Sequence, residues 1–275
     1  MSTTTFYSTI PPLLVTREHG SWAVLIVPML VSFAVVGRWS VDFVWIVVTG
    51  LALFLGYVPA QILLRHLSGM PQRAEKVDQA KFWGIVYGSA GLVCGGILLM
   101  KGYLFLLPIG GAGVFSFLVN FYLTKKYLKS IGTDLIAMAG LTLSGPSTYY
   151  VLAGNMDMKG LALYILNFLF FSCTVFYVHM KIKAAAVRKR EMGWREKFSI
   201  GGVNLIYNGV VLALVAVFSS MKLIPAIAVL AFIPMLFQGM YGTITLSGNV
   251  RFKFLGLILL AQSVIFGSIL SRTMR

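Results

Sequence analysis

The sequence predicts an all-α membrane protein with about nine helices that each cross the bilayer. Its composition, the lengths of its apolar stretches and the placement of its cations all indicate this fold class. Of the 275 residues, 58% are hydrophobic and only 11% are charged, and the mean hydropathy is +0.86. A soluble domain is about 25% charged, so these few charges would not cover a water-facing surface of this size. Lipid must therefore surround most of the side chains.

The apolar stretches support the same fold class. Each is close to the roughly 20 residues that a helix needs to cross a bilayer. Unpaired backbone groups are not tolerated in lipid, and these stretches lack the alternation of a barrel strand, so helices are the spanning form that fits. We predict a single transmembrane domain over residues 1–275, with spans at 20–37, 42–62, 82–100, 103–123, 133–153, 160–178, 203–220, 222–240 and 252–271.

The connections between these stretches alternate between rich and poor in Lys and Arg. One set carries 17 of the 23 cations, and the other set carries six. By the positive-inside rule the rich set faces the cytoplasm, which places the N-terminus inside and the C-terminus outside. No cation precedes Arg17, so the charged start of a cleaved signal peptide is missing, and we expect the first span to be retained. The rich set comprises the N-terminus, 63–81, 124–132, 179–202 and 241–253.

Cations that set the orientation of the protein in the membrane explain the formal net charge of +15. We therefore expect no nucleic-acid partner, although a basic excess often indicates one. Cys94 and Cys173 both lie inside apolar stretches. They are expected to be buried thiols rather than a disulfide.

A short motif precedes the first span. Residues 16–23 have the sequence TREHGSWA, and Pro28 follows. This segment resembles the Lys/Arg-Glu-His-Gly-Ala-Trp-Ala motif that opens members of the YwiC-like family of bacterial membrane proteins. The resemblance implies a multi-pass protein of the bacterial cytoplasmic (inner) membrane. It implies no particular activity, so it leaves open whether the protein is an enzyme.

The predicted topology also resembles that of the UbiA superfamily of intramembrane prenyltransferases. Those proteins have nine helices and large cytoplasmic connections after the second and sixth spans. The resemblance implies a UbiA-like bundle that binds a lipid, quinone or isoprenoid-type molecule. In that superfamily, Asp-rich motifs in the two connections hold Mg²⁺ against a diphosphate. The corresponding segments here, 61–66 and 177–183, contain no acidic residue, so we expect no cofactor and disfavour Mg²⁺-dependent transfer.

Basic and polar side chains occupy the positions where the UbiA pattern has acids. We predict that they hold the polar head of an anionic, amphipathic ligand at a basic cytoplasmic mouth, with its tail in the helix bundle. The simpler interpretation is that they set the topology and contact lipid phosphates. The three histidines lack the spacing of a metal site, so no metal ligands are assigned. The candidate ligand-binding residues are Arg17, Glu18, His19, Gln61, Arg65, His66, His179, Lys181 and Lys183; catalytic residues are not assigned.

Amides within or beside the spans are expected to hydrogen-bond across helices. They are Asn120, Asn167, Asn204, Asn208, Gln238 and Gln262.

Three alternative functions stay open. One is a divergent UbiA-type prenyltransferase that uses Glu75 and Asp78, which lie three residues apart. Another is a transporter for a small anion. The third is an accessory subunit with a partner in a larger membrane complex. Membrane lipids are expected partners in every case. An isoprenoid or quinone is the expected ligand of the predicted binding protein and of the divergent prenyltransferase.

Overall fold

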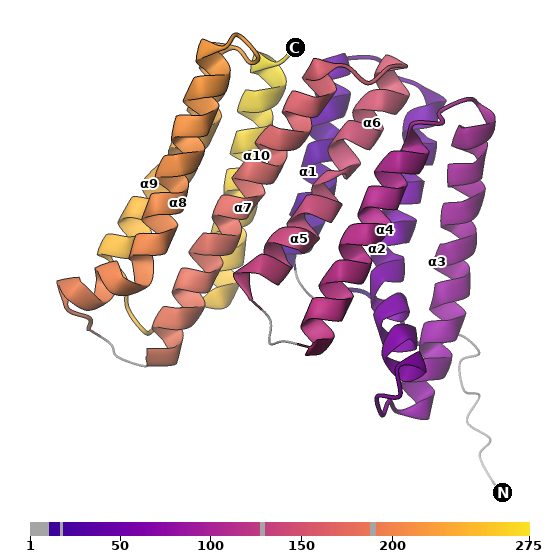
Figure 1. The fold of residues 1–275 in the computed structure, drawn as a ribbon, viewed down its shortest axis with the longest axis horizontal. Coiled ribbons are helices and arrows are strands. Elements are labelled where there is room, and N and C mark those ends of the chain that lie inside the picture. The colour runs from indigo at the N-terminus through magenta and orange to yellow at the C-terminus, as the bar shows by residue number, and fades with distance from the viewer. Residues whose placement is uncertain (1–10, 17–18, 127–129, 188–190) are drawn as a thin grey trace, which may run out of the picture. The chain divides into compact units, whose positions relative to one another are not determined.

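A computed structural model describes residues 11–16, 19–126, 130–187 and 191–275 of the chain, with the side chains of His19 and Lys126 not described. The described residues form helices and connections only, which confirms the predicted all-α fold class (Figure 1). The helices are α1 His19–Val36, α2 Val41–Leu67, α3 Ala74–Met100, α4 Leu106–Lys126, α5 Ile131–Thr142, α6 Ser144–Ala153, α7 Met158–Val187, α8 Trp194–Ser220, the 3₁₀ helix η1 Ala226–Phe232, α9 Ile233–Ile244 and α10 Phe252–Thr273.

Each predicted span coincides with a helix or with two consecutive helices. The described residues contain seven helical segments that are long and apolar enough to cross a membrane: α2, α3, α4, α7, α8, the continuous segment of η1 and α9, and α10. The α1 segment is apolar but shorter. The predicted span 133–153 is divided into α5 and α6. These helices make the chain a multi-pass membrane protein, while the sidedness of its termini stays a prediction.

The division between α5 and α6 has a local cause. Pro146 has no backbone N–H, and its ring would collide with the carbonyl of Thr142 in an unbroken helix. The chain therefore leaves α5 at Thr142 and begins α6 at Ser144. At the break, the Ser144 hydroxyl donates to the carbonyl of Leu25 in α1 at 2.8 Å. Ser32 donates to the carbonyl of Gly145 at 2.9 Å, so α1 is tied to α6 at the break.

The chain divides into two compact units, which are described separately. The smaller unit comprises residues 44–101 with the segment 11–16. In it, α2 and α3 pack closely, because a Cβ on Gly91 would lie only 3.6 Å from that of Ala52. Trp83 also donates to the carbonyl of Pro12 at 3.0 Å, which fixes the N-terminal segment against α3. The single domain that the sequence predicts stays a prediction.

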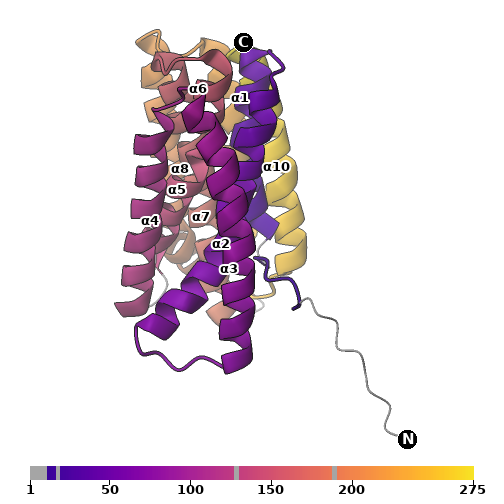
Figure 2. The same cartoon turned by 90° about the vertical axis from the view of Figure 1, so that its right-hand side faces the viewer.

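The larger unit comprises residues 19–43 and 102–275, and α7 lies at its centre. More than half of the apolar stretch of α7 is buried, a larger share than in any other candidate span. It packs against α1, α5, α6, α8 and α9, and α1 lies beside α6 and α10 (Figures 1 and 2). Residues near the end of α7 are therefore positioned to face other helices rather than lipid.

Within the larger unit, the helix ends that flank the cation-rich connections lie at one end. The ends of α4, α7 and α9 are at the lower end of this unit in Figure 1, and the ends of α6 and α8 are at the upper end. This arrangement agrees with the alternation of cations in the sequence. We call the lower end, formed by the ends of α4, α7 and α9 and the starts of α5, α8 and α10, the basic end.

Candidate functional site

The nine predicted ligand-binding residues are divided between the two units. Arg17 and Glu18 lie outside the described residues, and His19 begins α1. Near the end of α2, in the smaller unit, Gln61 donates to the Tyr57 hydroxyl at 2.7 Å. Five predicted residues remain. Arg65 is half-buried and His66 is exposed on α2, whereas His179, Lys181 and Lys183 lie on α7 of the larger unit.

The three residues of α7 point in different directions. A helix turns through about 200° over two residues, so alternate side chains face nearly opposite sides. His179 accordingly contacts α5, and Lys181 contacts α9. Lys183 is exposed. The structure thus places the predicted residues of α7 in two separate environments at the basic end.

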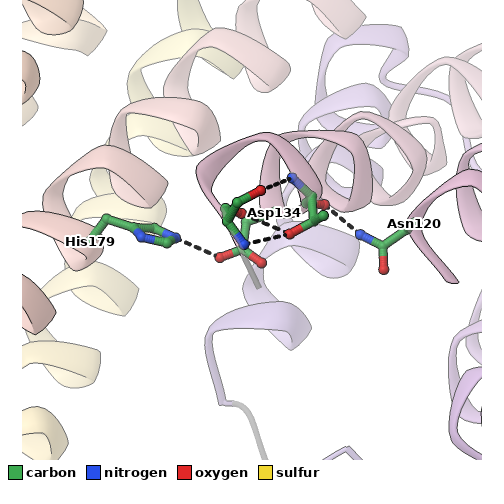
Figure 3. A network of polar contacts seen from close by, with 5 residues as sticks. Asn120, Asp134 and His179 are labelled. Carbon is green, nitrogen blue, oxygen red and sulfur yellow. Dashed lines mark hydrogen bonds and ion pairs between the residues drawn. The ribbon is translucent and has the colours of Figure 1, made fainter. Parts of the chain in front are cut away.

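His179 forms an ion pair or hydrogen bond with Asp134, at 2.8 Å between Nε2 and Oδ2 (Figure 3). The side chains are 16% and 20% exposed, so water screens this contact only partly. Asp134 lies in the first turn of α5, where a carboxylate also interacts favourably with the helix dipole. When Nε2 carries the proton, the carboxylate fixes the orientation of the imidazole ring.

The start of α5 is held in place by its own cap and by α4. The Ser130 hydroxyl accepts from the backbone N–H of Thr133 at 3.3 Å, and the Thr133 hydroxyl accepts from the N–H of Ser130 at 3.0 Å. This reciprocal pair is a capping box, with Thr in the position that Glu often takes. The buried Asn120 amide of α4 donates to the Thr133 carbonyl (Figure 3). Asp134 is therefore presented to His179 from a fixed backbone.

Asp134 was not among the predicted site residues, although the sequence contained a signal for it. The spans 133–153 and 160–178 are joined by a short connection, so they form an antiparallel pair. Asp134 is one residue inside the start of the first, and His179 is one residue past the end of the second. Both must then lie at the same end of the pair, and only the rotation of each helix remained unknown.

Replacing Asp134 by Ala tests whether this contact stabilises the protein. The change leaves His179 without its acceptor in a mostly buried position, so we expect a loss of about 1–2 kcal/mol in the free energy of unfolding. Denaturant titration of the purified protein in detergent measures it. Asp78→Ala is the control, because the Asp78–Lys81 pair is 75% and 61% exposed and should contribute less than about 0.5 kcal/mol. Equal losses in the two variants would contradict a specific role for Asp134.

A second environment lies on the other side of α7. The Lys181 ammonium donates to the carbonyl of Gly242 on α9 at 3.0 Å, and it lies 5.4 Å from the centre of the Tyr177 ring. Tyr177 is buried against Gly242, where a Cβ would come within 2.5 Å of the ring. The absence of a side chain at Gly242 therefore permits the contact between the lysine and the α9 backbone.

Buried amides continue this environment along α8 and α9. Asn204 is 1% exposed and Asn208 is 4% exposed. Asn208 donates to the backbone carbonyl of Asn204 at 2.8 Å and to its Oδ1 at 3.1 Å. Gly239 faces both amides, since a Cβ there would lie 3.3 Å and 3.4 Å from their nitrogens. We call Tyr177, Lys181, Asn204, Asn208, Gln238 and Thr243 the inner polar cluster.

The inner polar cluster has unused hydrogen-bonding capacity. Asn204 Nδ2 is buried and has no partner among the described residues. Both amide atoms of Gln238 are buried without a hydrogen bond of good geometry, and the amide lies within reach of the Tyr177 hydroxyl. The expectation that span amides bond across helices is thus confirmed for Asn120 and for Gln262, which donates to the Pro234 carbonyl of α9 at 3.3 Å. Asn167 and Asn208 bond within their own helices instead, and Asn204 and Gln238 keep buried atoms without a bond of good geometry. Buried polar groups in this state are costly, and a ligand is one means of satisfying them.

The electrostatics of the basic end favour an anion. Its exposed cations outnumber the three acids that the structure describes there, Asp134, Glu191 and Glu196. In the part of the chain that is described, no three His, Cys, Asp or Glu side chains come together as a metal site would require. The exposed cations are Lys125, Lys183, Arg195, Arg251 and Lys253.

Comparison with known proteins identifies one family. Residues 15–149 match the family model described as YwiC-like protein, a range that runs from the Arg17 motif through most of α6. The predicted resemblance to this family is therefore confirmed. No curated protein and no solved structure matches the chain, and the resemblance to the UbiA superfamily stays a prediction. Asp134 lies inside the matched range, whereas the inner polar cluster lies beyond it.

Proposed function

We propose that this YwiC-like, multi-pass membrane protein binds an anionic amphipathic molecule, with the acidic head at Lys181 and the apolar tail between helices of the larger unit. The proposal keeps the ligand class that the sequence predicts, a lipid, quinone or isoprenoid-type molecule that carries an acid group. It assigns the head to α7, α8 and α9.

The orientation of Lys181 is the observation that carries the proposal. A lysine near a helix end in a membrane usually extends toward water. Lys181 instead donates to the Gly242 carbonyl and lies over the Tyr177 ring. Lys181 is thus half-buried, with its ammonium turned toward α9 near the end of that helix. A partly buried ammonium in a membrane bundle is costly and is typical of a ligand or ion site.

Lys181 also has capacity for a ligand. An ammonium has three N–H donors, and in the described part of the chain only one of them is used, at Gly242. No acidic side chain pairs with Lys181 in the described part of the chain. A carboxylate or phosphate would supply the missing charge and form hydrogen bonds that are stronger than those between neutral groups.

The proposal does not use the acids on which a divergent prenyltransferase would depend. Glu75 and Asp78 are exposed at the start of α3 in the smaller unit, and Asp78 pairs with Lys81 at 3.3 Å. Ligand binding requires no reaction, so the proposal leaves catalysis unassigned.

Mass spectrometry of molecules that co-purify in mild detergent tests the proposal. We expect wild-type protein to retain an acidic amphiphile and Lys181→Met to retain about tenfold less, since a charge-assisted hydrogen bond contributes roughly 1.5–3 kcal/mol. Lys183→Met is the matched control, because Lys183 is on the same helix but exposed. It should retain the wild-type amount. Equal retention by wild-type and Lys181→Met proteins would refute the proposal.

A further inference from the structure

We infer that the inner polar cluster selects hydroxyl groups on the head of the bound amphiphile, so that the preferred ligand is an acidic lipid with a polyol headgroup. This inference rests on the proposed function, because it takes the acid group to be at Lys181. It adds that Asn204, Gln238 and Tyr177 recognise the uncharged part of the same head.

Asn204 provides a donor. Its side chain is 1% exposed, and its Oδ1 already accepts from Asn208 at 3.1 Å. Its Nδ2 has no partner among the residues that the structure describes. A buried amide N–H without an acceptor is destabilising, so the position favours a ligand that supplies an oxygen acceptor.

Gln238 provides both a donor and an acceptor. Its Nε2 and Oε1 are both buried without a hydrogen bond of good geometry, and the amide lies within reach of the Tyr177 hydroxyl. A phosphate or carboxylate ion offers only acceptors, which would leave Oε1 unsatisfied. A hydroxyl group both donates and accepts, so it matches the amide of Gln238 and the N–H of Asn204 together.

The spacing along α9 places these groups beyond the acid site. Gln238 precedes Gly242, whose carbonyl binds Lys181, by one helical turn, which is about 6 Å along the axis. Between them, Gly239 places no side chain against the Asn204 and Asn208 amides. A short carbon chain with hydroxyl groups, attached to the acid group, would extend from Lys181 toward the two amides.

A purely structural role for these amides accounts less well for the geometry. Amides that join membrane helices use their donors on neighbouring helices, as Asn120 does with the Thr133 carbonyl. Among the described residues, Asn204 instead bonds only to Asn208, one turn away on its own helix. The side-chain donor of Asn204 therefore does not join helices there.

Binding of two defined lipids to the delipidated full chain in phosphatidylcholine nanodiscs tests the inference. The probes are phosphatidylglycerol, whose head carries two alcohol hydroxyls, and phosphatidic acid, whose head carries more negative charge but no alcohol hydroxyl. We expect wild-type protein to bind phosphatidylglycerol about tenfold more tightly, because its hydroxyls satisfy buried polar groups that phosphatidic acid leaves unpaired. Charge attraction alone predicts the opposite order.

Variants separate the two claims. Asn204→Leu should lose the preference for phosphatidylglycerol, yet bind both lipids more tightly than Lys181→Met does, and Gln238→Leu should behave like Asn204→Leu. Gln262→Leu is the matched control, because Gln262 on α10 also has a buried, unbonded amide oxygen. It should keep the wild-type preference. A melting temperature for Asn204→Leu at or above that of wild-type protein is expected and shows that the variant folds.

The outcomes are distinguishable. Equal affinity of wild-type protein for the two lipids, with weaker binding by Lys181→Met, overturns the inference and leaves the proposed function standing. Equal binding by wild-type and Lys181→Met proteins overturns the proposed function itself. Glycerol 3-phosphate, the same type of head without acyl chains, should not compete at micromolar concentration; if it does, the ligand is soluble and the inference is overturned.

Discussion

Gly242→Ala is expected to destabilise the protein by about 3 kcal/mol, because the added methyl group would overlap a buried ring. A Cβ at this position would lie 2.5 Å from Tyr177 Cε2, 2.6 Å from its hydroxyl oxygen and 2.9 Å from Cζ. The ring is 5% exposed and has Lys181 close to its face. It therefore has little room to move, and either α9 must shift away from α7 or the ring must leave its position.

Thermal unfolding in detergent measures this effect, with Gly202→Ala as the control. Gly202 lies inside α8, and a Cβ there would meet no atom within 4 Å. Because Ala forms helix more readily than Gly by about 1 kcal/mol, this control should be unchanged or slightly more stable. A Gly242→Ala protein that melts together with the control would mean that α7 and α9 do not pack as described.

Phe170→Ala is expected to cost about 3 kcal/mol by removing the centre of an aromatic core. Phe170 is 1% exposed and stacks on Phe266 of α10 with ring centres 3.9 Å apart. Phe171 and Phe232 contact it edge-on, at 5.2 Å and 6.4 Å. Lipid is as apolar as a phenyl ring, so the loss comes from packing contacts and the cavity rather than from transfer to water. The estimate is therefore at the lower end of the range for soluble cores.

Denaturant titration in detergent compares Phe170→Ala with Phe237→Ala. The control removes the same side chain from α9, where Phe237 is 64% exposed. We expect it to lose less than about 0.5 kcal/mol, in the range of substitutions on an exposed surface. Similar losses in the two variants would show that α7 does not form the centre of the larger unit.

The sequence predicted the helices well because bilayer thickness determines their length. Long apolar stretches coincide with α2, α3, α4, α7, α8 and α10. It did not predict the division between α5 and α6, because proline alone does not determine a break: Pro28 and Pro59 lie inside the continuous helices α1 and α2. The break near Pro146 also depends on α1, whose Ser32 bonds to the Gly145 carbonyl.

The site was predicted less completely than the fold. Position along the helix placed His179, Lys181 and Lys183 at the basic end, but their directions depend on how α7 is rotated in the bundle. That rotation turns His179 toward Asp134 and Lys181 toward Gly242. Gly239 and Gly242 contribute by lacking a side chain, which lets α9 approach α8 and α7 closely. No charge or motif in the sequence marks such a contact.

The central claim is that an acidic amphiphile binds beside Lys181, and photo-crosslinking from the neighbouring residue tests it most directly. Photo-methionine, which is close to methionine in size, would replace every methionine of the protein. The labelled protein would be placed in nanodiscs of phosphatidylcholine that contain a minority of phosphatidylglycerol. Met180 is 2% exposed and accepts from Thr243, whereas Met240 is 46% exposed on α9. We predict lipid adducts on Met180 that are strongly enriched in phosphatidylglycerol, and adducts on Met240 that follow the bulk composition. Met180 adducts of bulk composition, or no lipid adduct on Met180, would contradict the claim.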